Sequence, residues 1–248
     1  MTSILSRQNR PALAYHHFKP EKANSLTPLI FLGGFRSDME GTKAIYLQDK
    51  CINQDREFVR FDYSGHGKSE GKFEECLLSD WAQDCIDIIN HCFDVPAVIV
   101  GSSMGGWISF IVAQKTPEKI AGLLGLAAAP DFTQWIESQL NDKQRDALAN
   151  QGYFDLENDY GAPYAITKAL LEDGLKNSLL HKKIKVDFPI HLIQGKIDAD
   201  VPWQTAEKIK NVFVNSDLNI TYIEQGDHRL SKPQELDIIW GAVEKLLA

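Results

Sequence analysis

The chain has 248 residues, of which 44% are hydrophobic and 24% are charged, with a net charge of -8 and a pI near 5.4. An acidic chain without clustered Lys and Arg is not expected to bind nucleic acid, because contacts with phosphates need such clusters. This length and composition favour a single α/β domain, residues 1–248, that carries one insertion.

The N-terminal residues, the length of the apolar runs and the cysteines bear on the cellular location of the protein. Residues 1–11 lack the apolar segment of a signal peptide, and no apolar run reaches the ~18 residues that a membrane span needs. The four cysteines form no C-x-x-C pair, so we interpret them as apolar core residues in a reducing compartment. We therefore expect a cytoplasmic protein without stable membrane insertion; the sequence does not indicate its oligomeric state.

Short β-rich apolar runs alternate with helix-periodic segments, which is typical of parallel strands joined by crossover helices. The predicted strands are Ala12–Phe18, Leu29–Leu32, Phe58–Phe61, Ala97–Val100, Gly122–Ala127, Ile190–Ile193 and Ile220–Ile223. The predicted helices are Thr42–Asn53, Asp80–His91, Met104–Lys115, Thr205–Phe213 and Pro233–Leu247. Several strands are apolar throughout, as expected for strands that are covered on both faces. The predicted fold class is α/β, with a mostly parallel, twisted central sheet and helices on both faces.

The alternation stops between Asp131 and Asp187, where we predict two or three helical pieces and no clear strand. An insertion that follows one core strand and precedes the next lies over the carboxyl ends of the strands, where ligands bind in open α/β sheets. We therefore predict that residues 131–187 form a small helical lid. The alternative is a peripheral helical hairpin that only shields the sheet.

A G-x-S-x-G pentapeptide, Gly101-Ser102-Ser103-Met104-Gly105, lies between a predicted strand and a predicted helix. In a strand-turn-helix elbow the serine adopts a strained conformation, so small residues are needed on both sides of it. The elbow exposes the Ser103 hydroxyl and places the Met104 N–H at a helix N-terminus, where negative charge is favoured. Ser103 is therefore the predicted nucleophile; the alternative is a glycine-rich turn without catalytic function.

A serine nucleophile needs a base and an acid that orients the base, and in this type of fold both follow the serine along the chain. Among the later histidines, His228 lies in a loop directly after a predicted strand, so it is the predicted general base. Asp198 follows the tight turn at Gly195 and is the predicted acid, with Asp131 and Asp200 as alternatives. Asp200 lies closer to the next helix and could cap it instead.

The loop that follows the strand Leu29–Leu32 contains two glycines and then Phe35 and Arg36. Glycines allow the backbone to approach a substrate carbonyl closely, so the Phe35 N–H is predicted to join the Met104 N–H in an oxyanion hole. Arg36 could bind a carboxylate of the substrate, but an ordinary surface ion pair is favoured. His66, in the turn-rich segment after the next strand, is predicted to be structural.

No His, Cys and carboxylate cluster has the spacing of a zinc site, and no phosphate-binding glycine loop follows a strand. We expect neither a cofactor nor a bound metal.

Several longer strings, one of which contains the pentapeptide, are similar to those of a known enzyme family. They are Gly41-Thr42-Lys43-Ala44, Arg60-Phe61-Asp62-Tyr63-Ser64-Gly65, Val100 to Trp107, Val201-Pro202-Trp203 and Asp227-His228-Arg229. The chain resembles the serine α/β-hydrolases, in particular the branch with the mitochondrial acyl-protein thioesterase that also cleaves acyl glucuronides. The resemblance implies the α/β-hydrolase fold, a triad of Ser103, Asp198 and His228, and hydrolysis of an ester or thioester. The chain lacks an Arg-rich, Ser-rich targeting extension, so we expect neither organelle nor physiological substrate to carry over.

The predicted function is therefore that of a serine hydrolase that forms an acyl-enzyme on Ser103, with a small acyl ester or an S-acylated molecule as substrate. Two alternative functions are compatible with the same fold and the same triad. A ligand receptor would keep the triad but turn over slowly, and a peptidase or carbon–carbon hydrolase would attack another bond, because fold and triad do not fix the substrate.

Overall fold

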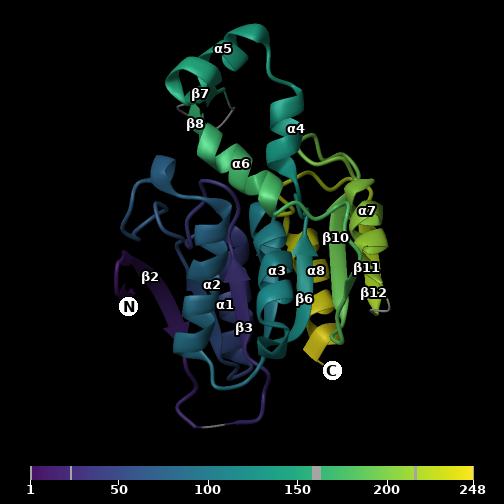
Figure 1. Cartoon of the computed structure of the whole chain (residues 1–248). Coiled ribbons are helices and arrows are strands. Elements are labelled where there is room, and N and C mark those ends of the chain that lie inside the picture. Colours follow the sequence, from purple (N-terminus) through teal and green to yellow (C-terminus); the bar gives the residue numbers. More distant parts are fainter. Residues whose placement is uncertain (1, 23, 158–162, 215–216, 248) are drawn as a thin grey trace.

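The computed structural model describes residues 2–22, 24–157, 163–214 and 217–247, and an eight-stranded sheet forms its centre (Figure 1). From edge to edge the strands are β1 (Ser3–Arg7), β2 (Arg10–Phe18), β4 (Phe58–Phe61), β3 (Leu29–Leu32), β5 (Ala97–Ser102), β6 (Ile120–Leu126), β10 (Ile190–Gly195) and β12 (Leu218–Ile223). β2 is antiparallel to both of its neighbours, and all the other pairs are parallel. The predicted mostly parallel sheet is confirmed.

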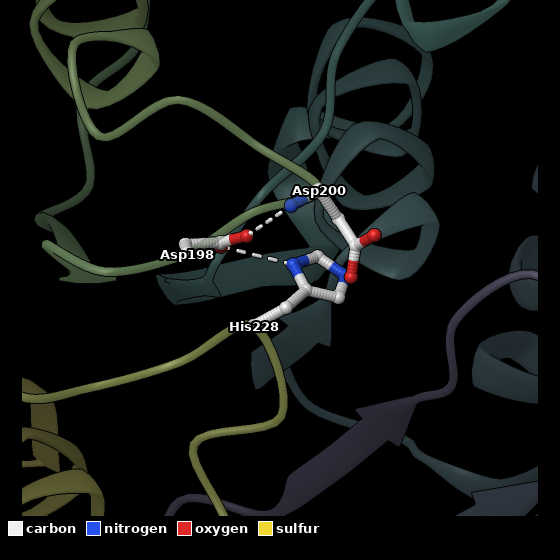
Figure 2. A group of neighbouring side chains, drawn as sticks. All are labelled: Asp198, Asp200 and His228. Atoms are coloured by element: carbon white, nitrogen blue, oxygen red, sulfur yellow. Dashed lines mark hydrogen bonds and ion pairs between the residues drawn. The ribbon is translucent and has the colours of Figure 1, made fainter. Parts of the chain in front are cut away.

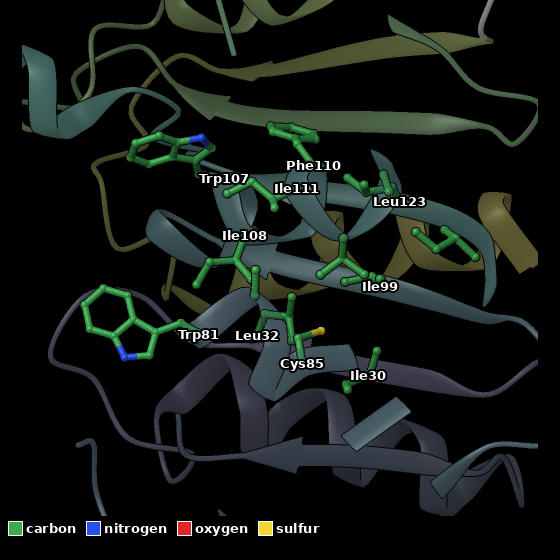
Figure 3. Close-up of a cluster of buried hydrophobic side chains, with 14 of the residues drawn as sticks. Ile30, Leu32, Trp81, Cys85, Ile99, Trp107, Ile108, Phe110, Ile111 and Leu123 are labelled. Carbon is green, nitrogen blue, oxygen red and sulfur yellow. The ribbon is translucent and has the colours of Figure 1, made fainter. Parts of the chain in front are cut away.

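Helices cover both faces of this sheet, as predicted. Successive strand side chains point to opposite faces, so Ile30 and Leu32 of β3 join one buried cluster and Leu29 and Phe31 join the other. The first cluster contains side chains of α2 (Leu78–Cys92), α3 (Met104–Lys115) and α7 (Thr205–Val212), and Figure 3 shows α2 and α3 contributing to it. The second contains side chains of α1 (Thr42–Asn53) and α8 (Pro233–Leu247).

The described elements from residue 132 to residue 176 rise above the carboxyl ends of the parallel strands, and the chain then passes beside the sheet to the start of β10 (Figure 1). These elements are α4 (Phe132–Ser138), α5 (Asp142–Gln151), β7 (Tyr153–Leu156), β8 (Tyr164–Thr167) and α6 (Lys168–Lys176), and β9 (Ile184–Lys185) lies on the return to the sheet. The expectation of a helical segment without a clear strand is wrong here, because β7 and β8 pair as an antiparallel hairpin. Residues 158–162 of the predicted insertion lie outside the described residues. Short elements complete the chain: η1 (Phe73–Glu75), η2 (Pro117–Lys119) and β11 (Phe213–Val214), which pairs with β9.

The edge strand β1, which the sequence pattern does not predict, brings a buried charge to the sheet. The Arg7 side chain is only 7% exposed, and its Nη1 lies 2.6 Å from Oδ1 of the fully buried Asp84 on α2. The other oxygen of Asp84 accepts the Ser64 N–H at 2.8 Å. Arg7 also reaches Asp87, which is 25% exposed, at 2.8 Å. The hairpin is therefore anchored to α2 through a desolvated ion pair, in which each charge needs the other.

Asp84→Asn is expected to lower the free energy of unfolding by about 3 kcal/mol, because it leaves the Arg7 guanidinium buried without its anionic partner. Asp87→Asn is the matched control, since it removes a carboxylate from the same guanidinium at a solvated position and should cost less than about 1 kcal/mol. Urea unfolding of the three proteins measures both changes. Equal losses for the two variants would contradict the assigned role of the buried pair.

Candidate active site

Ser103 occupies a sharp elbow between β5 and α3. Its φ of 54° and ψ of -118° form a sparsely populated backbone conformation, which costs a residue other than glycine roughly 1–3 kcal/mol. The turn is held by hydrogen bonds on both sides: the Ser103 N–H donates to Leu126 O at 2.9 Å, and the Ser103 carbonyl accepts the Ala129 N–H at 3.1 Å. The elbow is therefore fixed by the last residue of the neighbouring strand β6 and by the loop that follows it.

The elbow depends on two glycines that let the backbone pass closely. A Cβ added to Gly101 would lie 2.4 Å from Gly105 O, and one added to Gly105 would lie 2.3 Å from Leu32 O. Neither position has room for a side chain without backbone movement. The pattern of small residues on both sides of Ser103 thus has a steric cause in this fold.

Two loops at the same end of the sheet bring an imidazole and a carboxylate to Ser103. His228, after β12, places its Nε2 atom 3.0 Å from Ser103 Oγ, and its Nδ1 atom lies 2.9 Å from Asp198 Oδ2 (Figure 2 shows the contact with Asp198). The Asp198 side chain is fully buried, whereas His228 is 21% exposed. The three residues singled out in the sequence therefore form one continuous hydrogen-bonded set.

The Asp198 carboxylate is fixed by further donors, one of which the sequence pattern does not reveal. Its Oδ1 atom accepts the N–H groups of Asp200 and Val201 at 2.9 and 2.8 Å. Its Oδ2 atom accepts Nε2 of Gln194, a buried side chain, at 2.9 Å. These donors fix the orientation of the carboxylate. Gln194 is the one polar side chain among the last residues of an apolar strand, and that position was its only signal.

Neither alternative acid takes the place of Asp198. The Asp131 carboxylate accepts the N–H groups of Leu179 and Leu180 at 2.6 and 2.9 Å, so it ties the start of the insertion to a segment 48 residues later. Asp200 does not cap α7, whose N-cap is Gln204 without a side-chain hydrogen bond. Instead its carboxylate extends toward the part of the His228 ring that lies away from Asp198 (Figure 2).

Asp198, Asp200 and His228 are also the one group of metal-ligand types among the described residues, with ligand atoms within 4.8 Å of one another. Sequence spacing did not predict this group, because the residues come from two loops. Both oxygens of Asp198 and both nitrogens of His228 already have hydrogen-bond partners. The arrangement fits an acid–base set better than a cation site.

The segment after β3 runs beside Ser103. A Cβ added to Gly34 would lie 3.4 Å from Ser103 Cβ, so this glycine lets the loop approach the serine closely. The Gly34 carbonyl accepts the Ser37 N–H at 3.2 Å and the Ser37 hydroxyl at 2.7 Å. In a trans peptide the N–H points opposite to the C=O, so the Phe35 N–H is directed away from Ser37. Arg36 forms a long ion pair with Glu74, at 3.8 Å.

A cavity of about 950 Å³ opens above Ser103 and has walls of two kinds. Apolar side chains of the insertion form one wall, namely Phe132, Trp135, Ile136, Leu140, Leu156 and Tyr164. Polar side chains from α1 and from the His228 loop line another part, namely Thr42, Lys43, Arg229 and Ser231. Burial lowers the pKa of Lys43 to about 8, and its ammonium group donates to the Arg229 carbonyl. The sequence pattern did not single out Lys43 as a pocket residue.

In sequence and in fold the chain is similar to known proteins. A family model described as serine aminopeptidase, S33, matches residues 31–150. Palmitoyl-protein thioesterase ABHD10, mitochondrial, from Bos taurus is 31% identical over 99% of this chain and 79% of its own length. The structure of a putative hydrolase from Agrobacterium vitis superimposes with a TM-score of 0.94 at 35% identity, covering 100% of this chain and 98% of the other. Mouse ABHD10 superimposes with a TM-score of 0.89 at 30% identity, covering 99% and 98%.

The chain belongs to the ABHD10 family of α/β-hydrolases. It is therefore an enzyme, a hydrolase, and the predicted fold and family are confirmed. The alternative of a triad-bearing receptor is set aside. No helix in the described part of the chain is both long and apolar enough to cross a membrane. The predicted cytoplasmic location finds no support in these comparisons, because the ABHD10 relatives are named as mitochondrial.

Proposed function

We propose that this enzyme hydrolyses carboxylic esters or thioesters through an acyl-enzyme on Ser103. The observation that carries the proposal is the unbroken chain of hydrogen bonds from Asp198 through His228 to Ser103, at the floor of the cavity. A serine hydroxyl is a weak nucleophile until a base accepts its proton, and an imidazole at 3.0 Å is placed to do so. The ABHD10 relatives are named palmitoyl-protein thioesterases, which supports a thioester as one bond cleaved.

In the proposed cycle Ser103 Oγ attacks the substrate carbonyl carbon while its proton passes to His228 Nε2. The buried Asp198 carboxylate holds the imidazole and stabilises its cationic form. The N–H groups of Met104 and Phe35 receive the oxyanion; Met104 begins α3, where backbone donors lack partners within the helix. His228 then protonates the leaving group, and a water molecule hydrolyses the acyl-enzyme.

The two kinds of cavity wall support separate binding places for the acyl chain and the leaving group of the substrate. An acyl chain fits the apolar wall of the insertion, where its burial is favourable, and a polar leaving group fits the wall that contains Lys43 and Ser231. In this proposal residues 131–187 act as a lid over the acyl chain. A peptidase, which the description of the family model favours, would instead have to accept an amino-terminal residue at the same place.

Ser103→Ala is expected to lower kcat for p-nitrophenyl butyrate by several powers of ten, because the acyl-enzyme cannot form. Ser102→Ala is the matched control at the neighbouring position and should lose less than about tenfold. A fluorophosphonate probe should label the control but not Ser103→Ala. Near-normal turnover by Ser103→Ala would overturn the proposed nucleophile.

Asp198→Asn is expected to lower kcat by about 10⁴-fold, because an amide no longer selects the correct imidazole tautomer. Asp131→Asn and Asp200→Asn are the controls, since one carboxylate anchors the insertion and the other does not bond to Nδ1. Both should keep far more activity in the same ester assay. The opposite ranking would reassign the acid.

A panel of p-nitrophenyl esters and acyl thioesters of graded acyl length tests the substrate class. Each methylene buried against the insertion should raise kcat/KM by up to about fourfold, which corresponds to ~0.8 kcal/mol, until the cavity is filled. An aminoacyl p-nitroanilide serves as the peptidase control and should be cleaved poorly. Preference for that anilide over all the esters would favour the peptidase alternative.

A further inference from the structure

We propose that His66 is a positioning residue that holds the turn of residues 34–37 in the form required by the oxyanion hole. This inference rests on the proposed function, because the turn contains Phe35, whose N–H is assigned as an oxyanion donor. His66 lies on the loop after β4, is only 4% exposed, and does not line the cavity.

The turn itself has an unusual backbone. The Ser37 N–H donates to the Gly34 carbonyl, so Phe35 and Arg36 occupy the two central positions of a four-residue turn. Arg36 has a φ of 59°, which is typical of the third position in a type II turn, where glycine is the normal residue. Compared with a type I turn, the peptide between Phe35 and Arg36 is flipped. A residue other than glycine needs an external interaction to keep that flip.

His66 supplies this interaction, and its own hydrogen bonds fix which ring nitrogen does so. Its Nδ1 atom lies 3.2 Å from the Ser64 carbonyl, which can only accept, so Nδ1 carries the proton. Nε2 is then an acceptor, and the Arg36 N–H donates to it at 3.2 Å. If the peptide flipped to the type I form, the Phe35 carbonyl would replace that N–H and face the Nε2 lone pair. His66 therefore opposes the flip.

The surroundings keep the imidazole neutral and oriented. Its ring packs against the rings of Tyr63, Phe73 and Trp81, at centroid distances of 5.6, 5.2 and 5.2 Å. Burial, with a smaller contribution from the Arg36 cation, lowers the pKa of His66 to about 4. Nε2 consequently remains an acceptor throughout the pH range in which a serine hydrolase operates. The Arg36 guanidinium also stacks over Phe73, 4.3 Å from the ring centroid.

The Ser64 carbonyl that orients His66 belongs to the buried network already described. It accepts Trp81 Nε1 at 3.0 Å, and the Ser64 N–H is bound by Asp84. A second contact from the same loop holds the chain beyond the turn, because the buried Asp62 carboxylate accepts the Met39 N–H at 2.6 Å. The loop after β4 thus braces the oxyanion segment at two points.

Two amide substitutions separate positioning from packing. The oxygen of Gln in His66→Gln can reach the place of Nε2, whereas the oxygen in His66→Asn reaches only the place of Nδ1 and cannot accept from Arg36. We expect His66→Asn to lower kcat for p-nitrophenyl butyrate by about ten- to hundredfold with KM within about twofold, since only the transition state uses the oxyanion donors. His66→Gln should recover most of that loss. Tyr63→Phe is the control on the same loop, because the buried Tyr63 hydroxyl has no hydrogen-bond partner among the described residues.

Inhibition by a trifluoromethyl ketone tests the proposed role of His66 independently of turnover. Ser103 Oγ bonds to its carbonyl carbon, the serine proton passes to His228, and the resulting oxyanion needs the same donors. Its inhibition constant should rise in His66→Asn in parallel with the fall in kcat/KM, while inhibition by butyrate should change little.

Equal kcat values for His66→Asn, His66→Gln and wild type would overturn the inference, and so would a loss confined to KM. Equal losses in the two variants, in step with their thermal stability, would assign His66 to packing alone. Ser103→Ala in the same assay separates the two proposals. If Ser103→Ala is inactive while His66→Asn is fully active, only the role of His66 is wrong; if Ser103→Ala is active, the proposed function is wrong.

Discussion

The close approach of β5, α3 and the end of β3 at the elbow is the constraint on which the rest of the site depends. Two backbone segments pass Gly101 and Gly105 at distances that no Cβ tolerates, and this close approach permits the sharp elbow in which Ser103 has a positive φ. Because β3 and β5 are paired neighbours in the sheet, the segment after β3 must leave the sheet beside Ser103. One steric requirement therefore sets both the exposure of the hydroxyl and the place of the proposed oxyanion donors.

Close backbone packing also brings His228 and Asp198 to this end of the sheet. β10 and β12 are paired, so the loops that follow them emerge side by side, and a Cβ on Gly195 would lie 2.2 Å from Gly226 O. That contact brings the loop of Asp198 against the loop of His228. The carboxylate is then surrounded by fixed donors, including Gln194, before it meets the imidazole. Preorganisation of this kind means that little of the site has to reorganise when charge develops.

Much of this could be predicted from the sequence, and the failures have physical causes. The elbow is local, so the spacing of its glycines reveals it, and strand order alone places Asp198 and His228 on adjacent loops. β1 was missed because an edge strand with few apolar residues lacks the pattern of a buried strand, and β7 and β8 form a small hairpin outside the central sheet. The roles of Gln194 and of Asp131 were not predictable, because each depends on hydrogen bonds made only after distant loops meet.

The turn at Phe35 contacts both the insertion and the core of the domain. The Phe35 ring packs against Phe132 and Tyr164 of the insertion, at centroid distances of 5.5 and 5.8 Å, and against Phe73 of the core at 4.9 Å. The backbone, in contrast, is bound to core groups through the Arg36 N–H in the turn and the Met39 N–H just beyond it. Movement of the insertion would remove ring contacts without breaking either of those bonds. Because side chain and backbone have separate anchors, the proposed function predicts that the cavity walls adapt to different acyl groups while the proposed oxyanion donors beside Ser103 stay in place.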